Sequence, residues 1–324
     1  MKAIVAERYG RPESPAVLEL RTVDMPVLED HQVLVRVHAS SVNPAEWYEI
    51  TGLVVARPSN GWLKPKRGRV GSDLAGRIEA VGKEVTDFQP GDEVFGAAPG
   101  SWAEYTVARG DRLVRKPPNV SFEEAGAVAI AALTALQALR DQGRVQSGQK
   151  VLVNGASGGV GTYAVQLAKW FGAHVTAVCS TRNVDQAQTL GADRVVDYTK
   201  EDFTQLDERH DLMLDIAGRT PFSKFRRVLT PEANVVLVGG HMTYRGLGPL
   251  PHLGGTMLAM MGRSQKAKFF VAKITQEDLE VMRGLLESGT VKSIIDRSYE
   301  LSETPAALAY LGEGHARGKI VITV

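Results

Sequence analysis

The chain has 324 residues, of which 44% are hydrophobic and 23% charged, as expected for a globular protein long enough for two domains. Its net charge of +1 disfavours nucleic-acid or anionic membrane partners, and its single cysteine, Cys179, excludes an internal disulfide framework. Charges come too early for a secretory signal core, and no apolar run reaches the ~18 residues of a bilayer-spanning helix. We therefore expect a cytoplasmic protein that binds neither nucleic acid nor membrane.

The first part of the chain has the pattern of a β-rich domain. Short runs rich in Val and Ile, such as KAIVA, QVLVRVHASSVN and GRIEAVG, alternate with Gly- and Pro-containing turns. This spacing predicts an antiparallel, barrel-like fold. After Pro117-Pro118 the pattern changes to a helical one over residues 121–143, which begins with a capping-box pair, Ser121 and Glu124.

From Val151 onward, strand and helix patterns alternate. The expected strands are VLVNG, HVTAVCS, RVVDY, DLMLDIAG and NVVLVGG, with a shorter edge strand near FFVAKI. Such alternation is typical of an α/β fold with a doubly wound parallel sheet. The tail reads helix, strand, helix, strand, and we expect it to return to the first domain. The predicted domains are residues 1–122 with 273–324, and residues 123–272.

The stretch NGASGGVG, residues 154–161, lies between a predicted strand and a predicted helix. Glycines there permit a tight turn and close approach of the backbone to a pyrophosphate, and the helix N-terminus supplies free N–H donors. We expect a dinucleotide at this loop, although a glycine-rich turn without a ligand is the alternative. The loop residues expected to hold the cofactor are Gly155, Ser157, Gly158, Gly159, Val160 and Gly161.

The end of the second predicted strand indicates which dinucleotide is bound. Sites for NAD usually carry an acidic residue there, which accepts a hydrogen bond from the ribose 2′-hydroxyl. This chain has Ser180, Thr181 and Arg182 instead, and no acid before Asp185. Two hydroxyls and a guanidinium suit a 2′-phosphate, so the sequence predicts NADP(H). The alternative is that Arg182 is only a solvated residue at the start of the next helix.

Several adjoining motifs together are more specific than the loop. They are SVNPAEWYEITG, VGSDLAGRIEAVG, FQPGDEVFG, AALTAL, NGASGGVGTYAVQLAKWFGA, LGADRVVDY and GHARGKIVITV, and they span most of the chain. With these motifs the chain resembles the medium-chain dehydrogenase/reductase superfamily, and within it the zinc-independent quinone oxidoreductase branch. The resemblance implies a Rossmann domain that binds NADP and a discontinuous, β-rich GroES-like barrel domain.

The resemblance also implies roles for individual residues. Asn43 matches a position near the nicotinamide ribose, Thr134 a position beside the nicotinamide, and Tyr48 a tyrosine at the active-site cleft. Further expected cofactor contacts are Ser180, Arg182 and Tyr198 around the 2′-phosphate, Gly239 and Gly240 near the nicotinamide, and Lys319, for which a purely structural place is the alternative.

The resemblance further implies that the chain departs from the zinc-dependent branch. Those relatives have a cysteine in place of Asn43, a histidine-glutamate pair in place of Ser72-Asp73, and another ligand near Ile130. Only the acid, Asp73, could be a retained ligand. One cysteine cannot supply a structural zinc loop, and the seven histidines have no ligand spacing. We expect no metal ion.

Without a Lewis acid, oxidation of a simple alcohol is difficult, whereas reduction of an already activated acceptor is not. The sequence therefore favours hydride transfer from NADPH to a quinone or an α,β-unsaturated carbonyl compound. Tyr48 is the candidate proton donor, and the alternative is that it only lines the pocket. A metal-free alcohol or carbonyl dehydrogenase and a non-catalytic NADPH-binding protein remain alternative functions. The resemblance also implies a homodimer.

A Met- and Leu-rich segment, residues 240–266, allows three interpretations. It could cover an apolar substrate, contribute to a dimer surface, or form ordinary helix core. Helix core is slightly favoured for Met257 and Met260.

Overall fold

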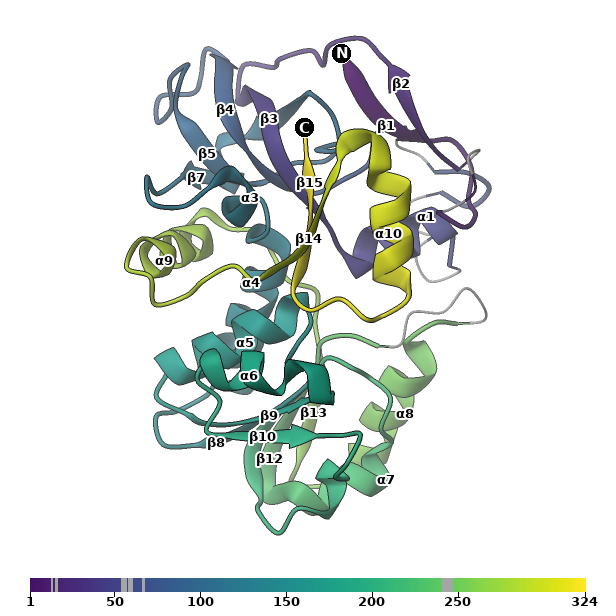
Figure 1. Cartoon of the computed structure of the whole chain (residues 1–324), viewed down its shortest axis with the longest axis vertical. Coiled ribbons are helices and arrows are strands. Elements are labelled where there is room, and N and C mark those ends of the chain that lie inside the picture. Colours follow the sequence, from purple (N-terminus) through teal and green to yellow (C-terminus); the bar gives the residue numbers. More distant parts are fainter. Residues whose placement is uncertain (13, 15–16, 54–56, 58–60, 66–67, 241–246) are drawn as a thin grey trace. The chain divides into compact units, whose positions relative to one another are not determined.

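The computed structural model describes the chain except for residues 13, 15–16, 54–56, 58–60, 66–67 and 241–246. The described chain divides into two compact units (Figure 1). Unit 1 comprises residues 1–133 and 273–324, and unit 2 comprises residues 134–240 and 247–272. This division falls inside helix α4 (Ala129–Gln137), whereas the predicted boundary lies between residues 122 and 123, before that helix.

Unit 1 is built on a largely antiparallel sheet with the strand order β14-β15-β3-β4-β5-β7, in which β6 also pairs with β3. Only the β14–β15 pair in this sheet is parallel. Strands β1 and β2 form a separate antiparallel pair. The strands of unit 1 are β1 (Lys2–Ala6), β2 (Leu18–Thr22), β3 (Gln32–Val42), β4 (Asp73–Val81), β5 (Glu93–Ala97), β6 (Tyr105–Arg109), β7 (Leu113–Arg115), β14 (Ile295–Glu300) and β15 (Lys319–Thr323).

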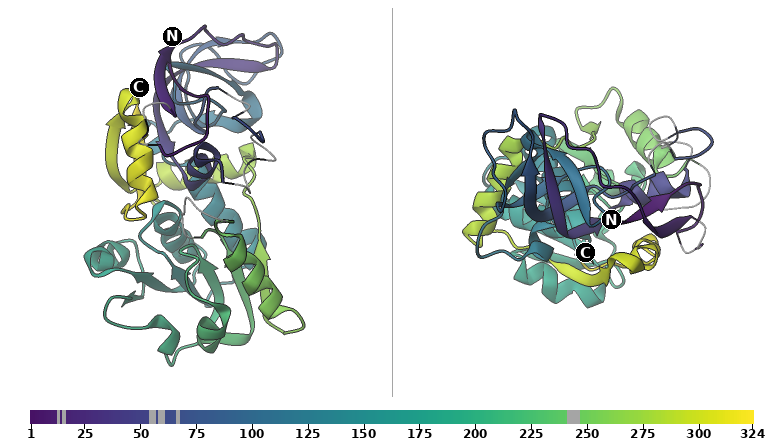
Figure 2. Two further views of the ribbon diagram at one scale, coloured as in Figure 1. Left: turned by 90° about the vertical axis from the view of Figure 1, so that its right-hand side faces the viewer. Right: turned by 90° about the horizontal axis from the view of Figure 1, so that it is seen from above.

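The core of unit 1 follows from alternating side chains. Val33, Val35 and Val37 on β3 are all buried, and they pack with Leu74 and Ile78 of β4. Among the residues that the structure describes, this unit has the helices α1 (Pro44–Thr51), α3 (Phe122–Ala125), α9 (Gln276–Glu287) and α10 (Thr304–Gly312). Figure 2 shows α10 and β15 beside the purple N-terminal segment, and β15 pairs directly with β3. The tail therefore returns to the unit formed by the start of the chain, as the sequence predicted.

Unit 2 contains a parallel sheet with the order β10-β9-β8-β11-β12-β13. Its strands are β8 (Lys150–Asn154), β9 (His174–Cys179), β10 (Arg194–Asp197), β11 (His210–Asp215), β12 (Leu229–Leu237) and β13 (Lys266–Phe269). The order reverses at β8, as in a doubly wound Rossmann sheet. The predicted α/β fold with a parallel sheet and a second β-rich domain is confirmed. The edge strand, however, precedes FFVAKI and overlaps it only at Phe269.

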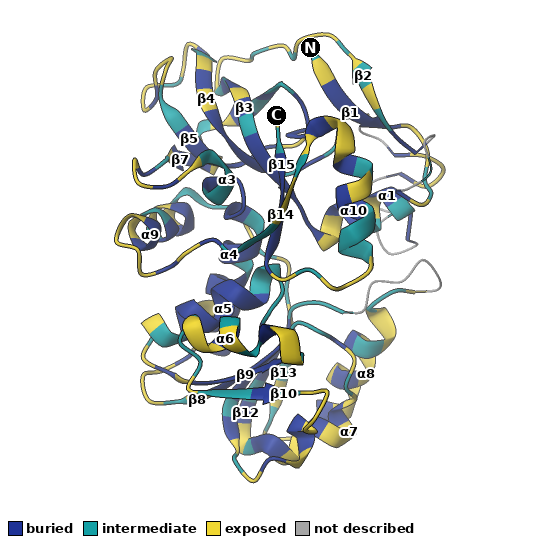
Figure 3. Ribbon diagram, in the orientation of Figure 1, coloured by how far each residue is buried: buried dark blue, intermediate teal, exposed yellow. Residues whose placement is uncertain are grey.

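The helices of unit 2 are α5 (Gly159–Trp170), α6 (Val184–Thr189), α7 (Phe222–Phe225) and α8 (Leu250–Met260). Helix α5 is dark blue over most of its length in Figure 3, because residues 161–168 are all buried. It contacts β8 and β9, whereas α8 contacts β13. These contacts hold helix α5 against the sheet, and with it the glycine-rich turn that precedes the helix.

The helical segment predicted over residues 121–143 is divided into three parts. The capping box is present, since Ser121 Oγ accepts from the Glu124 N–H at 3.1 Å, but α3 ends at Gly126 after a single turn. A Cβ atom on Gly126 would lie 3.0 Å from the Ala39 carbonyl carbon, so the chain turns where it packs closely on β3. Helix α4 then starts at Ala129, and residues 138–143 continue as a π-helical turn. Long-range packing overrides the local pattern here.

Candidate functional site

The glycine-rich turn of unit 2 is shaped by close backbone contacts. Gly155 has a φ of +95°, a conformation that favours glycine, and its N–H donates to the Val178 carbonyl at 3.2 Å. A Cβ atom on Gly161 would lie only 2.1 Å from the Gly155 carbonyl oxygen. The absence of side chains at these two positions therefore lets the start of α5 pack directly against the turn.

The N-terminus of α5 offers backbone donors. Gly158 is its N-cap and no side chain caps the helix, whereas the Thr162 N–H donates to the Gly158 carbonyl at 2.9 Å. The N–H groups of the first turn of any helix have no partner within the helix. Ser157, Gly159 and Val160 are only half-buried, so these donors are accessible. The arrangement fits a pyrophosphate bound at the end of a twelve-residue helix.

Ser180 and Thr181 follow β9 and make hydrogen bonds to neighbouring side chains. Ser180 Oγ accepts from Asn183 Nδ2 at 3.0 Å, and Thr181 Oγ1 donates to Asp197 Oδ2 at 2.6 Å. The Thr181 bond is the main cause that lowers the pKa of Asp197 to about 2. The sequence analysis missed Asp197. This residue pairs in register with Cys179, and the carboxyl ends of neighbouring parallel strands lie together, so its position at the end of β10 was the available signal.

Arg182 and Tyr198 are both exposed near the same strand ends. Arg182 belongs to the 3₁₀ turn of residues 181–183, and the Tyr198 N–H donates to the Cys179 carbonyl at 3.0 Å. The structure thus brings the predicted 2′-phosphate residues to the carboxyl ends of β9 and β10, the edge at which open α/β sheets bind ligands.

Gly239 and Gly240 follow β12, close to the turn after β11. A Cβ atom on Gly218 would lie 2.4 Å from Gly240 Cα, so these two chain segments touch backbone to backbone. Beneath them, Asp215 accepts from the Gly218 N–H at 3.1 Å and lies 2.7 Å from His252 Nε2. Neither Asp215 nor His252 stood out from the sequence pattern. Thr134, the remaining predicted nicotinamide contact, lies within α4.

In unit 1, a buried polar cluster surrounds Asp73 at the start of β4. Its carboxylate accepts four hydrogen bonds, from Asn43 Nδ2 at 2.9 Å, Ile130 N–H at 2.8 Å, Lys319 Nζ at 3.2 Å and the Ser41 hydroxyl. We define the unit 1 polar cluster as Ser41, Asn43, Glu46, Asp73 and Lys319, all of which are buried. Two predicted site residues, Asn43 and Lys319, are therefore direct partners of Asp73, which the sequence analysis considered only as a possible retained zinc ligand.

The backbone before β15 brings Lys319 into this cluster. Gly318 has a φ of +128°, and a Cβ atom there would lie 2.2 Å from the Ile294 carbonyl oxygen, so only glycine fits without distortion. The Lys319 side chain is 3% exposed, and its ammonium also donates to Asn43 Oδ1. With Oδ1 accepting from an ammonium and Nδ2 donating to a carboxylate, the orientation of the Asn43 amide is determined.

Glu46 lies in the first turn of α1 and completes the cluster. Its Oε2 atom accepts from the Asn43 N–H at 2.9 Å, as part of a capping box. Burial raises the pKa of Glu46 to about 7, and the negative charge of Asp73 adds to the shift. Glu46 is thus a buried carboxyl group that changes protonation near neutral pH.

Tyr48 lies on the same helix and is half-buried. Its ring packs edge-on against Trp47, with the ring centroids 5.5 Å apart. Burial raises the pKa of Tyr48 to about 12. The phenol therefore keeps its proton at neutral pH, which suits a hydrogen-bond donor.

The donor set of unit 1 does not fit a zinc ion. Zinc sites use Cys, His or carboxylate ligands, but Asn43 and Ser72 are not such residues, and Asp73 is already engaged with four donors. Among the residues that the structure describes, no group of three or more His, Cys, Asp or Glu side chains could hold a metal ion.

Comparisons with known proteins agree with this architecture. A family model described as zinc-binding dehydrogenase matches residues 190–322, and one described as alcohol dehydrogenase GroES-like domain matches residues 29–118. The chain is 34% identical to the chloroplast envelope quinone oxidoreductase homolog of Arabidopsis thaliana, across 99% of the chain and 98% of that protein.

Two further relatives are similar over most or all of the chain. The 2-methylene-furan-3-one reductase of Solanum lycopersicum is 34% identical, across 99% of the chain and 79% of that protein. The solved structure of the quinone oxidoreductase from Coxiella burnetii has a TM-score of 0.87 and 30% identity, and the match covers 100% of this chain and 99% of that one.

Proposed function

Because the chain belongs to the medium-chain dehydrogenase/reductase superfamily, in its quinone oxidoreductase-like branch, we propose that it is an NADPH-dependent oxidoreductase. In this proposal it transfers hydride to a quinone or an α,β-unsaturated carbonyl compound without a metal ion. The observation that carries the proposal is the accessible, uncapped start of α5, which follows a glycine-rich turn at the edge of a Rossmann sheet.

The cofactor would be held by unit 2 residues already described. The first-turn N–H groups of α5 would bind the pyrophosphate, and Ser180, Arg182 and Tyr198 would surround the 2′-phosphate. The segment from Cys179 to Asn183 contains no carboxylate, which supports NADPH over NADH. When bound, the nicotinamide supplies the hydride, and the protein binds and orients it and excludes water.

The proposed acceptor class follows from the donor chemistry of unit 1 and from the relatives. Because the residues of the unit 1 polar cluster do not fit a zinc ion, we infer an acceptor that already delocalises the incoming negative charge. Quinones and enones do so. Two similar proteins are named a quinone oxidoreductase homolog and a 2-methylene-furan-3-one reductase, and these names refer to acceptors of the two kinds.

A panel of acceptors tests this function. Oxidation of NADPH should be measured at 340 nm with quinones, enones, saturated aldehydes and, in the reverse direction, simple alcohols. Turnover should appear with a quinone or an enone and be much weaker with saturated compounds. Equal rates with alcohols would favour the metal-free alcohol dehydrogenase. Tight NADPH binding without any turnover would favour a non-catalytic role.

Tyr48 is the proposed donor to the reduced product. A phenol held in its protonated form by burial can donate a hydrogen bond to a developing enolate oxygen. If it does, Tyr48→Phe should lower kcat by at least ~10² with little change in KM for NADPH. Tyr299→Phe, which also removes a phenol from unit 1, is the matched control and should retain full activity. If kcat of Tyr48→Phe falls by less than about twofold, Tyr48 only lines the pocket.

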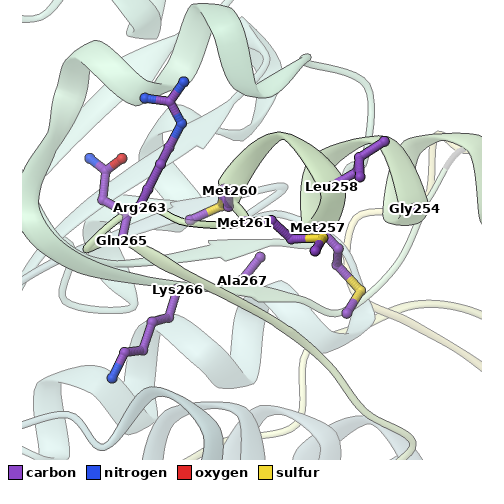
Figure 4. A pocket seen from close by; sticks show the side chains of 9 residues that line it. All are labelled: Gly254, Met257, Leu258, Met260, Met261, Arg263, Gln265, Lys266 and Ala267. Atoms are coloured by element: carbon purple, nitrogen blue, oxygen red, sulfur yellow. The ribbon is translucent and has the colours of Figure 1, made fainter.

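We also propose that the protein forms a homodimer through the outer edge of unit 2. Met260 is buried, as expected for helix core, but Met257 is not, and Leu258 and Met261 are 70% and 73% exposed. With β13 residues they line a groove of about 460 Å³ (Figure 4). Strand β13 lies at the edge of the sheet, so one of its sides can pair with another strand.

Light scattering after size-exclusion chromatography tests the dimer. Leu258→Asp combined with Met261→Asp should convert a dimer to a monomer because both charges would be buried in the interface. Leu63→Asp, at a 93% exposed leucine of unit 1, is the control and should leave the dimer intact. A wild-type monomer at micromolar concentration would contradict the proposal.

A cytoplasmic location is likewise proposed. No helix in the described part of the chain is long and apolar enough to cross a bilayer. Cell fractionation with an antibody to the full chain tests the location, and recovery in an organelle or membrane fraction would contradict it.

A further inference from the structure

The unit 1 polar cluster raises a question that the proposed function does not answer. The superfamily includes zinc-binding members, and one matching family model is described as zinc-binding dehydrogenase. Yet this chain keeps a buried carboxylate, Asp73, beside a second buried acid, Glu46. Buried acids that lie together usually attract a cation. Which feature of the chain prevents a metal ion from binding here?

The protein itself uses most of the acceptor capacity of Asp73, and Oδ2 in particular meets three donors. A carboxylate has about four acceptor positions. Ser41, Asn43 and Lys319 donate to Oδ2, and the Ile130 N–H donates to Oδ1. Asp73 is fully buried, so an incoming ion would have to compete with these donors away from bulk solvent.

Lys319 is the one donor among these that also carries a positive charge. Its ammonium lies 3.2 Å from Asp73 Oδ2 and also donates to Asn43 Oδ1. It thus occupies the space between two oxygens that would otherwise be available to a cation. A divalent ion at this place would have to displace the ammonium or bind against its charge, and both are costly in a buried site.

We propose that the Lys319 ammonium is a built-in cation that balances Asp73 and keeps divalent metal ions out of the unit 1 polar cluster. The inference deepens the metal-free part of the proposed function by naming the residue responsible. Its test measures zinc binding to the full chain rather than turnover. A negative result for catalysis would therefore not contradict the proposed role of Lys319. Likewise, a negative result for Lys319 would not contradict the catalytic proposal.

The experiment adds one zinc ligand with and without the lysine. Asn43→Cys places a thiolate beside Asp73 and Glu46, which are residue types that bind zinc. Zn²⁺ affinity should be measured by competition with a chromophoric chelator for the wild type, Asn43→Cys and the double variant Asn43→Cys/Lys319→Met. We expect the double variant to bind one Zn²⁺ per chain at least ~100-fold more tightly than Asn43→Cys.

A matched lysine provides the control. The side chain of Lys116 in the same unit is likewise only 5% exposed, and it pairs with Glu93 at 3.2 Å. Adding Lys116→Met to Asn43→Cys should leave the Zn²⁺ affinity of that variant unchanged. An equal gain with Lys116→Met would show that loss of any buried lysine loosens the unit, and would overturn the proposal.

Two further outcomes would overturn it. One is stoichiometric, tight Zn²⁺ binding by the wild type or by Asn43→Cys, both of which keep Lys319. The other is a folded double variant that binds Zn²⁺ no more tightly than Asn43→Cys. Circular dichroism establishes folding. If Lys319→Met unfolds the chain, Lys319→Gln replaces it in the double variant, and the same comparison with Asn43→Cys decides the outcome.

Discussion

The two polar regions of this protein differ in how their hydrogen-bonding groups are used. In unit 1, the carboxylate of Asp73 is buried and meets four donors from its own chain, one of them the Lys319 ammonium. In unit 2, the start of α5 has no capping side chain, and its backbone donors are accessible. The groups of the first region bond mainly to one another, whereas the second region has backbone donors that a ligand could use.

This difference indicates which substitutions should change the stability of the fold and which should change cofactor binding. Removing a member of the unit 1 polar cluster leaves a buried charge or polar group unpaired, so the main cost falls on folding. Removing a group from the unit 2 edge changes little inside the fold, so the main cost falls on cofactor affinity. The predictions below are ordered by expected size and test this separation.

Loss of Lys319 should have the largest effect on stability. Lys319→Met leaves Asp73 buried without its counter-charge, and the free energy of unfolding should fall by about 3–5 kcal/mol, measured in urea. The double variant Asp73→Asn/Lys319→Met removes both charges and should lose clearly less than the single variant. A single-variant loss below about 1 kcal/mol would contradict the idea that the cluster is internally balanced.

Glu46 should make stability depend on pH. Burial raises the pKa of Glu46 from an ordinary 4.5 to about 7, so between these pH values the folded state binds a proton that the unfolded state has released. Stability should therefore fall by about 3 kcal/mol in total as the pH rises from about 4.5 to about 7, and not change further from this group above that.

Urea unfolding of the wild type and Glu46→Gln across this pH range measures the effect of Glu46. The variant should lack this component of the slope, so the stability of the wild type relative to the variant should decline with rising pH. Parallel curves for the two proteins would show that Glu46 does not titrate in this range.

Arg182 should affect cofactor choice and not stability. Arg182→Ala should weaken NADPH binding by about 1.5–3 kcal/mol, the scale of a charged hydrogen bond, with little effect on NADH. Fluorescence titration of both cofactors measures it. Lys200→Ala removes another exposed cation, paired with Asp197 at 3.5 Å, and serves as the control. Equal losses of affinity for NADPH and NADH would contradict the proposed preference for NADPH.

Gly161 should have the smallest of these effects. A Cβ atom there meets the Gly155 carbonyl oxygen at 2.1 Å, so Gly161→Ala should destabilise the chain by about 1–3 kcal/mol in thermal unfolding and also weaken NADPH binding. Gly284 of α9 has no atom within 4 Å of such a Cβ. Gly284→Ala should instead stabilise by up to about 1 kcal/mol. A neutral Gly161→Ala would mean that the turn can shift to accept a side chain.

Local sequence signals predicted much of the fold. The alternation of strand and helix gave the parallel sheet, and the Ser121–Glu124 capping box is present at the start of α3. The break at Gly126 could not be predicted in this way, because it depends on packing against Ala39 on a distant strand.

The site residues also differ in whether local sequence could predict them. The glycine-rich turn could be read from contiguous residues, and so could the absence of an acid after β9. The contact between Lys319 and Asp73 could not, because 246 positions separate them in the chain. The role of Asp197 depends on strand register, and the pairing of Asp215 with His252 depends on how α8 packs. Resemblance drew attention to Lys319 and to Asp73 separately, but not to the contact between them.

The most direct test of the central claim is NADPH oxidation by protein treated with a strong chelator. With a quinone or an enone as acceptor, the account predicts turnover that is unchanged by the chelator or by added zinc, with kcat/KM higher for NADPH than for NADH. No turnover with any acceptor, or turnover that appears only when zinc is restored, would contradict it.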